Sequence, residues 1–185
     1  MDNIINYGVN MKQWFGVRTF NGYEQKVIDG LKQQIKEQKM ESYIDEIILP
    51  KSEEYTFVRN VLKKKEKLLY PGYIFVKMEN TNELIFFVRG IQYVTGYAGI
   101  SSMKEIPSPM EDSEIEHLKE EMQKIKVDLN VGDFVKVSGH ELYDGQSLKI
   151  ININPEKEEL ELELKSLLGD DERSEIFKFD QIVKK

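Results

Sequence analysis

The sequence predicts an α+β protein, in which an N-terminal antiparallel sheet with helices is followed by a small all-β barrel. Two observations predict this fold class. In residues 1–126, segments of strand composition are mixed with segments of helical periodicity, without the regular alternation of a parallel sheet. From residue 131 onward helical periodicity disappears, and several short strand-like segments follow one another. Closing these strands into a barrel would hide their edges, which is why we expect a barrel.

The first strand and the first helix are predicted between residues 14 and 39. Residues 14–20 are rich in aromatic and β-branched side chains, which is typical of a strand. The letters NGYE at residues 21–24 have the pattern of a capping box, in which the asparagine and the glutamate satisfy free backbone N–H groups. Apolar residues then recur at helical spacing, so a helix is predicted over residues 22–39.

The remaining elements of the N-terminal part follow from the same criteria. Composition and periodicity predict strands over residues 46–49, 55–62, 68–78 and 93–97 and a short helix over residues 82–88. The basic, polar residues 63–67 are predicted to form the tip of a hairpin. A second capping-box pattern at residues 113–116 opens an apolar stripe that reaches residue 125, which predicts a third helix.

The C-terminal part contains only strand signals. Strands are predicted over residues 134–137, 148–153, 159–164 and 176–183, and leucine alternates with glutamate along the third of them. The change of texture divides the chain into a first domain over residues 1–126, a short linker over residues 127–130 and a second domain over residues 131–185.

Composition excludes several classes of protein. The chain of 185 residues has no cysteine, which excludes disulfides and thiolate metal sites. No apolar run approaches the roughly 18 residues of a membrane span. The N-terminus lacks the charged start and apolar core of a signal peptide, so we expect a cytoplasmic protein with no membrane partner.

The negative charge is concentrated in the C-terminal part. Residues 1–126 hold 18 Lys+Arg against 19 Asp+Glu, a net charge of −1, and residues 127–185 hold 8 against 14, a net charge of −6. Phosphate is repelled by such a segment, so bulk nucleic-acid binding is not expected there. The same acidity disfavours a ribosome-associated barrel protein, which needs a basic surface to approach RNA.

An enzyme is not predicted. His117 stands between Glu114 and Glu121 at a spacing that would place all three on one helix face, where they would be able to hold a metal. These three residues are better explained as the solvated side of an amphipathic helix, because the apolar stripe forms its buried side. Residues 140–144 carry the other histidine with two carboxylates in a loop, and the sequence has no phosphate loop, nucleophile elbow or HExxH motif. We therefore expect no catalytic residues, no cofactor and no metal.

Several motifs resemble a known family in their order and spacing. WF at 14–15, NGYE at 21–24, LYPGYIFV at 69–76, VR at 88–89 and VTGY at 94–97 resemble the N-terminal domain of NusG. VGDFVKV at 131–137, the glycine at 139 and FDQIV at 179–183 resemble the KOW domain, a small SH3-like barrel that follows it. The resemblance covers nearly the whole chain from residue 12. The collinear combination is specific to the NusG family of transcription elongation and antitermination factors.

The resemblance implies a protein that contacts RNA polymerase and suppresses pausing. In the family, an apolar concavity of the N-terminal domain grips the coiled coil of the polymerase clamp. Tyr70 and Tyr73 stand at family positions of that concavity, and Trp14 and Phe15 lie in the neighbouring strand. Aromatic anchors suit a transient interface, because they offer much contact area at low entropic cost. The competing interpretation places these residues in the core; it is favoured for Trp14 and Phe75 and stays open for Tyr70 and Tyr73.

Two groups of residues are candidate contacts to nascent RNA or to upstream or non-template DNA. The first group is the basic run of Lys63, Lys64, Lys65 and Lys67. Such a run at a hairpin tip is more often merely solvated. The second group, on the barrel, is Lys136, His140, Tyr143 and Lys149. A ring and cations near a loop suit RNA, although the net charge of this half opposes it.

The C-terminal part departs from the family pattern. The usual Gly-Pro-Phe turn reads GHEL at residues 139–142, and Ser147 stands where a glycine is usual. In the family, this loop and the phenylalanine matched by Phe179 form a face for termination factor Rho or a small-subunit ribosomal protein, so Leu142 and Phe179 are the candidate partner face here. The departures and the short linker imply a specialised, operon-restricted paralogue of the kind represented by LoaP or RfaH.

Two alternatives to that interpretation stay open. One is an antiterminator that binds an RNA hairpin through the KOW domain, and the other is a housekeeping NusG that couples to Rho or the ribosome. A monomer is expected in each case.

Overall fold

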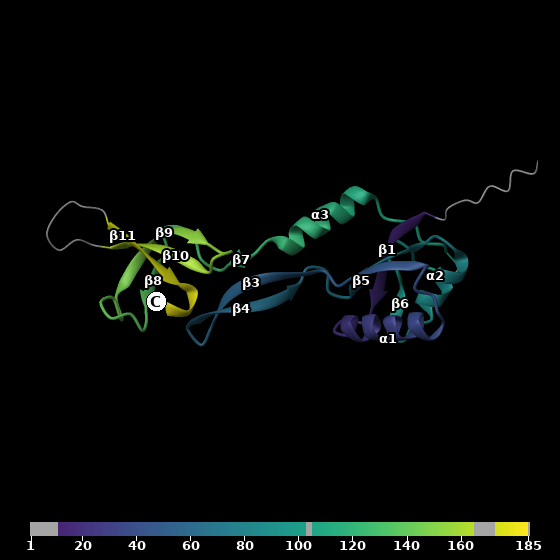
Figure 1. Ribbon diagram of the computed structural model, residues 1–185, viewed down its shortest axis with the longest axis horizontal. Helices are drawn as coiled ribbons and strands as arrows, with labels where there is room; N and C mark the ends of the chain where they lie inside the picture. The colour runs from purple at the N-terminus through teal and green to yellow at the C-terminus, as the bar shows by residue number, and fades with distance from the viewer. Residues whose placement is uncertain (1–10, 103–104, 165–172, 185) are drawn as a thin grey trace, which may run out of the picture. The chain divides into compact units, whose positions relative to one another are not determined.

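The computed structural model describes residues 11–102, 105–164 and 173–184 (Figure 1). The chain forms two compact units. The first is Met1–Lys51 with Leu68–Met122, and the second is Ser52–Lys67 with Gln123–Lys185. The second unit is therefore built from two segments that are separate in sequence. No helix in the described ranges is both long and apolar enough to cross a membrane.

The first unit is a four-stranded antiparallel sheet with helices. Its strands are β1 (Lys12–Thr19), β2 (Ile44–Ile48), β5 (Tyr73–Glu79) and β6 (Val94–Tyr97), and its helices are α1 (Glu24–Glu37), α2 (Asn82–Arg89) and α3 (Asp112–Gln123). The strand order is β2-β5-β1-β6, and β1 pairs with β5 along nearly its whole length, from Lys12 opposite Glu79 to Arg18 opposite Tyr73.

Both faces of the β1–β5 pair are buried. Successive side chains of a strand point to opposite faces. Phe15 and Val76, which lie opposite each other, join the main core with the apolar stripe of α1 and with α2. Trp14 and Phe75 point the other way and pack with Ile115 and other residues of α3. Figure 1 shows α1 and α3 on opposite sides of the sheet.

The second unit consists of strands. They are β3 (Lys51–Val58), β4 (Val61–Leu68), β7 (Lys126–Val127), β8 (Phe134–Val137), β9 (Ser147–Asn154), β10 (Glu159–Leu164), β11 (Arg173–Lys178) and β12 (Ile182–Val183), with a 3₁₀ helix at Phe179–Gln181. Their order is β11-β10-β9-β8-β12-β4-β3-β7. The alternation predicted for residues 159–164 is present, because Leu160 and Leu162 are fully buried while the glutamates at 159, 161 and 163 keep contact with solvent. The α+β fold class predicted from the sequence is confirmed.

The hairpin of β3 and β4 packs with the C-terminal strands. Tyr55 on β3 lies opposite Val127 on β7, and Val61 on β4 lies opposite Val183 on β12. Backbone hydrogen bonds support both pairings, from Asp128 N to Tyr55 O at 2.9 Å and from Lys184 N to Asn60 O at 2.8 Å. The sequence-based division at residues 126 and 131 stays a proposal, and the pairing of the hairpin adds residues 52–67 to the second compact unit.

The tip of this hairpin is not where we expected it from the sequence. The prediction of a tip at residues 63–67 is wrong, because the chain turns at Arg59 and Asn60, which have φ angles of 52° and 65°. Two successive left-handed residues make a tight hairpin turn whose twist matches that of the flanking strands. The lysine run therefore lies along β4, and its cations face water or acidic residues of β3.

Tyr55 is the main anchor of the hairpin in the second unit. Its side chain is only 3% exposed, and its ring packs edge-on against Phe179 at 4.8 Å between centroids. Its hydroxyl donates to Glu158 Oε1. Burial and the Glu158 carboxylate together raise the pKa of the Tyr55 hydroxyl, so it stays a proton donor at neutral pH.

Replacing Tyr55 with alanine is expected to destabilise the second unit by about 3–5 kcal/mol, because a buried ring and a hydrogen bond to Glu158 are both lost. Amide hydrogen exchange on the full chain measures this loss unit by unit. Protection should fall at Ile150 in the second unit and stay unchanged at Val17 in the first.

Tyr55→Phe is the matched control, since it keeps the ring and removes only the hydroxyl, at an expected cost of about 1 kcal/mol. An equal loss of protection at Ile150 and Val17 in the Tyr55→Ala variant would contradict the assignment of the hairpin to the second unit.

Candidate functional site

The turn between β4 and β5 presents the aromatic residues of the first candidate site. Tyr70 is 46% exposed, and its ring packs edge-on against Phe75 at 6.0 Å between centroids. Tyr73 begins β5 and is half-buried, and its N–H donates to Tyr70 O at 3.2 Å. Gly72 has a φ angle of 83°, a conformation that side-chain-bearing residues rarely adopt, so the turn requires this glycine.

A buried carboxylate holds this turn in place. Glu24 at the start of α1 is 3% exposed, and its Oε1 accepts from Gly72 N at 2.7 Å. Thr19 N donates to Gly72 O at 2.8 Å, so both polar groups of the glycine are satisfied by the first unit. The residue that caps the N-terminus of α1, Tyr23, makes no side-chain capping bond, and the side chain of Glu24 reaches to Gly72 in another part of the fold. The turn is therefore anchored at its tightest residue.

The electrostatics of Glu24 agree with this role. Burial by itself would raise the pKa of its carboxyl, but backbone N–H groups of Glu24, Gly72 and Gly22 outweigh burial and hold the pKa below its ordinary value of 4.5. A carboxylate that accepts from backbone N–H groups is stabilised in its charged form. The charged form of Glu24 thus stabilises the fold around the turn.

Trp14 and Phe15 lie inside the first unit. Trp14 is 4% exposed between the sheet and α3, and the ammonium of Lys119 lies 5.1 Å from the centre of its ring. Phe15 is completely buried in the main core, edge-on to Tyr97. Of the four aromatic residues predicted to contact a partner, Tyr70 and Tyr73 therefore reach the surface, and Trp14 and Phe15 support the sheet behind it.

Further exposed aromatic residues lie close to this turn in the fold. Phe20 is exposed, and its N–H donates to Tyr93 O at 3.0 Å. The ring of Tyr93 lies against that of Tyr23 at 4.4 Å between centroids, and Lys26 Nζ lies 4.8 Å from the Tyr23 ring. We did not predict these residues as a site; the aromatic residues that flank the asparagine and glycine at 21–22 were the signal in the sequence.

The basic run lies on β4 and is partly neutralised. Lys64 Nζ lies 2.8 Å from Glu53 Oε2, and Lys67 Nζ lies 3.2 Å from Glu54 Oε2. The hydrogen bond from Lys64 to Glu53 raises the pKa of its ammonium. Lys63 and Lys65 are exposed and, by the alternation of the strand, share the face opposite to buried Leu62.

The candidate residues of the second unit fall into two places. His140 and Tyr143 lie together, with ring centroids 5.1 Å apart, and both pack edge-on against Phe177. His140 Nε2 is 3.7 Å from Glu175 Oε1. Lys136 and Lys149 are exposed on the neighbouring strands β8 and β9 instead.

The two residues of the predicted partner face differ in exposure. Leu142 is 73% exposed in the loop after Gly139, whereas Phe179 is 3% exposed and packs against Tyr55. In this arrangement, only Leu142 offers its side chain to a partner.

No group of three His, Cys, Asp or Glu residues in the described ranges is arranged to hold a metal ion.

The chain is similar to one protein family, to several proteins of known sequence and to a solved structure. The family model described as transcription termination factor nusG matches residues 12–119, more than half of the chain. The transcription termination/antitermination protein NusG of Staphylococcus epidermidis is 29% identical over 180 residues, which cover 95% of this chain and 97% of that protein. The protein of the same name from Staphylococcus aureus has the same identity and coverage. A solved structure, "Domain interaction in Thermotoga maritima NusG", is 26% identical, covers 94% of this chain and 97% of that chain, and has a TM-score of 0.47.

Replacing Glu24 with glutamine is expected to destabilise the first unit by about 1–3 kcal/mol at neutral pH, because the charge-assisted bond to Gly72 becomes a neutral one. The folded-state pKa of Glu24 is lowered, so its contribution is present above pH 4.5 and is lost as the pH falls through the folded-state value. Urea unfolding of wild type and variant at neutral and acidic pH should therefore give curves that converge toward acid.

Glu41→Gln is the control for this experiment, since Glu41 is exposed and carries the same charge. A stability difference between Glu24→Gln and wild type that stayed constant from neutral to acidic pH would exclude an electrostatic role of the carboxylate.

Proposed function

The chain belongs to the NusG family of non-enzymatic transcription factors, and from this premise we propose that it is a transcription termination/antitermination factor that docks on RNA polymerase through Tyr70 and Tyr73. The observation that carries the proposal is the exposed aromatic turn, whose backbone is fixed by Glu24. In the family, polymerase is the common partner, and the resemblance of LYPGYIFV at residues 69–76 implies the coiled coil of the clamp as the surface that is gripped.

The geometry of the turn suits such an interface. A rigid aromatic anchor buries a large area on binding without losing many rotamers, so an anchored tyrosine gives affinity at a low entropic cost. The ring of Tyr70 is held by its contact with Phe75, and the backbone beneath it is held by the bond from Gly72 to Glu24. Trp14 on the neighbouring strand acts in this proposal as the buried support of the sheet rather than as a contact.

We further propose that the protein is a specialised, operon-restricted member of the family. The supporting feature is the loop after β8, which reads GHEL at residues 139–142 where the family usually has a Gly-Pro-Phe turn. The rings of His140 and Tyr143 are packed against Phe177, so Leu142 is the apolar side chain that this loop exposes. A face of this composition differs from the one that takes Rho or a ribosomal protein. Transcript profiles of a deletion strain would count against this proposal if they changed at essentially every operon.

A second candidate activity is contact with nucleic-acid phosphate by the basic face of β4. Lys63 and Lys65 are exposed on one face, whereas Lys64 and Lys67 are occupied by carboxylates of β3. A lysine that already pairs with a carboxylate gains less from phosphate, so Lys63 and Lys65 are better candidates than Lys64 and Lys67.

Replacing Tyr70 with glutamate is expected to lower affinity for a purified clamp coiled-coil fragment at least tenfold, because a charge would be buried in an apolar contact. The same variant should lose its effect on read-through in transcription from a terminator template in vitro. Tyr73→Glu is expected to act in the same direction.

Tyr43→Glu is the matched control, since Tyr43 is an equally exposed tyrosine of the first unit, in the turn before β2. Clamp affinity and read-through that stayed at wild-type levels in both Tyr70→Glu and Tyr73→Glu would remove the basis of the proposed docking.

Replacing Lys63 and Lys65 together with alanine is expected to weaken binding to an RNA–DNA scaffold and to reduce the slope of log affinity against log salt by roughly 1–2. Lys64→Ala with Lys67→Ala makes the same change of charge and should have the smaller effect, because both lysines already pair with glutamates. The nucleic-acid candidate fails if neither pair of substitutions alters the affinity or its salt dependence.

A further inference from the structure

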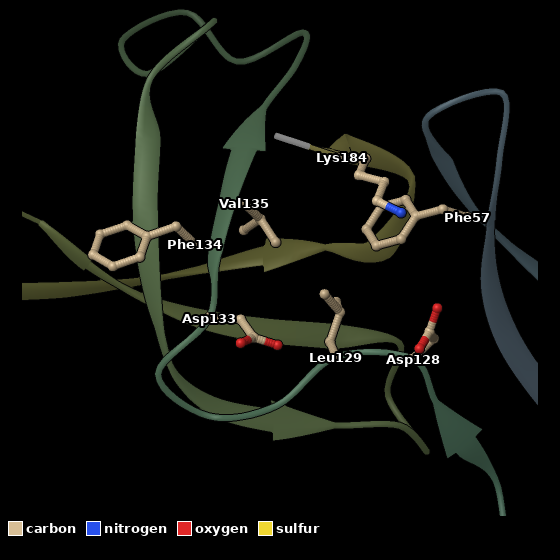
Figure 2. A pocket seen from close by; sticks show the side chains of 7 residues that line it. All are labelled: Phe57, Asp128, Leu129, Asp133, Phe134, Val135 and Lys184. Carbon is tan, nitrogen blue, oxygen red and sulfur yellow. The ribbon is translucent and has the colours of Figure 1, made fainter.

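A hollow in the second unit plays no part in the proposed function, although residues 133–135 of its lining lie in the motif VGDFVKV. It has a volume of about 480 Å³ and opens beside the start of β8 (Figure 2). Its apolar wall consists of Phe57 from β3, Leu129 from the segment after β7, and Val135 from β8. The ring of Phe134, which is 45% exposed, stands at its margin. An apolar recess of this size matches one or two side chains of a partner.

Two carboxylates stand at the mouth of the hollow. Asp128 and Asp133 are both exposed, and Leu129 lies between them (Figure 2). Each is fixed by the backbone around it. Asp128 N donates to Tyr55 O at 2.9 Å, and Asp133 Oδ2 accepts from Asn130 N at 2.8 Å. The carboxylate of Asp133 is therefore held by the backbone, and at Asp128 the bond to Tyr55 fixes the main chain from which the carboxylate extends.

The hollow already holds one cation of the chain itself. Lys184 Nζ lies 5.9 Å from the centre of the Phe57 ring, over its face, as Figure 2 shows. A cation over an aromatic face is attracted by the negative potential of the ring. The contact shows that the Phe57 ring attracts a positively charged group; an incoming cation would share the ring with Lys184 or displace it.

We propose that this hollow is a docking site for an arginine-bearing segment of another protein. The aliphatic part of an arginine would lie on Leu129, above the buried Val135, and its guanidinium would meet the carboxylates of Asp128 and Asp133. A guanidinium suits this arrangement better than an ammonium, because it forms two parallel bonds to a carboxylate and stacks on rings such as Phe57.

Charge selects the class of partner. The two carboxylates at the mouth outnumber the single lysine of the lining, Lys184, and residues 127–185 as a whole carry 8 Lys+Arg against 14 Asp+Glu, a net charge of −6 that repels phosphate. A basic peptide is steered toward such a surface, and a nucleic acid is repelled by it. The site is separate from Tyr70 and Tyr73, which belong to the first unit, so it adds a partner to the proposed docking on polymerase.

The hollow exists only while the hairpin is paired with the C-terminal strands. Phe57 reaches it because β3 pairs in parallel with β7, where Glu54 lies opposite Lys126 and Tyr55 lies opposite Val127. The C-terminal strands by themselves would lack the aromatic wall. The test therefore uses the full chain.

The test is a titration of the full-length, ¹⁵N-labelled protein with a synthetic nine-residue peptide in which arginine alternates with leucine. Amide resonances of residues 57, 128–135 and 184 are expected to shift together and to saturate. The control peptide carries citrulline in place of every arginine, which preserves shape and removes the charge; its affinity is expected to be at least fivefold lower.

Asp128→Asn combined with Asp133→Asn is expected to weaken binding of the arginine peptide about five- to tenfold. Asparagine at 133 keeps an oxygen that can accept from Asn130 N, so the loop is preserved. The matched control is Glu141→Gln with Glu156→Gln, which removes the same charge from exposed positions that do not line the hollow and should leave the affinity unchanged. Phe57→Leu keeps the apolar wall, removes the aromatic face and is expected to weaken binding about threefold.

Three results would overturn the proposal. The first is equal binding of the citrulline and arginine peptides, which would make the site merely apolar. The second is shifts at residues 128–135 that depend on protein concentration without peptide, which would assign the hollow to a second copy of the chain. The third is displacement of the peptide from these residues by a single-stranded oligonucleotide that itself shifts them, which would assign it to nucleic acid.

Discussion

The burial of both faces of the β1–β5 pair is the constraint on which the first unit depends. Antiparallel pairing from Lys12 to Arg18 sends Phe15 into the core with α1 and α2 and sends Trp14 toward α3. The buried aromatic residues of these strands, Trp14, Phe15 and Phe75, consequently stabilise the fold and do not reach a partner. The proposed partner surface lies at the end of these strands, at Tyr70 in the turn and at Tyr73, the first residue of β5. The hydrogen bond from Gly72 N to Glu24 Oε1 fixes the backbone of that turn against the rest of the first unit.

The second unit depends on a different pairing, between the β3–β4 hairpin and the strands β7 and β12. This pairing buries Tyr55 and Leu62 in the C-terminal core. The same pairing also determines which side chains of the second unit lie at its surface. It directs Lys63 and Lys65 away from that core and brings Phe57 to the hollow beside Asp128 and Asp133. Two of the proposed activities thus depend on one set of backbone hydrogen bonds, which join the hairpin to segments about 70 and about 120 residues away in sequence.

Much of this protein was predictable from local patterns. Strand alternation and helical periodicity are visible within ten residues, so the α+β class and most elements were predicted correctly. The collinear motifs identified the family, which the match over residues 12–119 confirms, and with it the absence of enzymatic activity. The hairpin tip was misplaced because a run of lysines resembles a loop in composition. The actual turn at Arg59 and Asn60 depends on two left-handed residues, and only asparagine hints at that conformation.

By itself, the sequence determined the class of fold, the family and which residues form the aromatic turn. All three depend on patterns among residues that are neighbours along the chain. Only the tertiary structure decided which aromatic residues are exposed, what Glu24 binds and which strands the hairpin joins. These depend on contacts between distant segments, such as Glu24 with Gly72 and Tyr55 with Phe179. Periodicity reports that a side chain has a buried or an exposed face, but it does not report which distant residue meets that face.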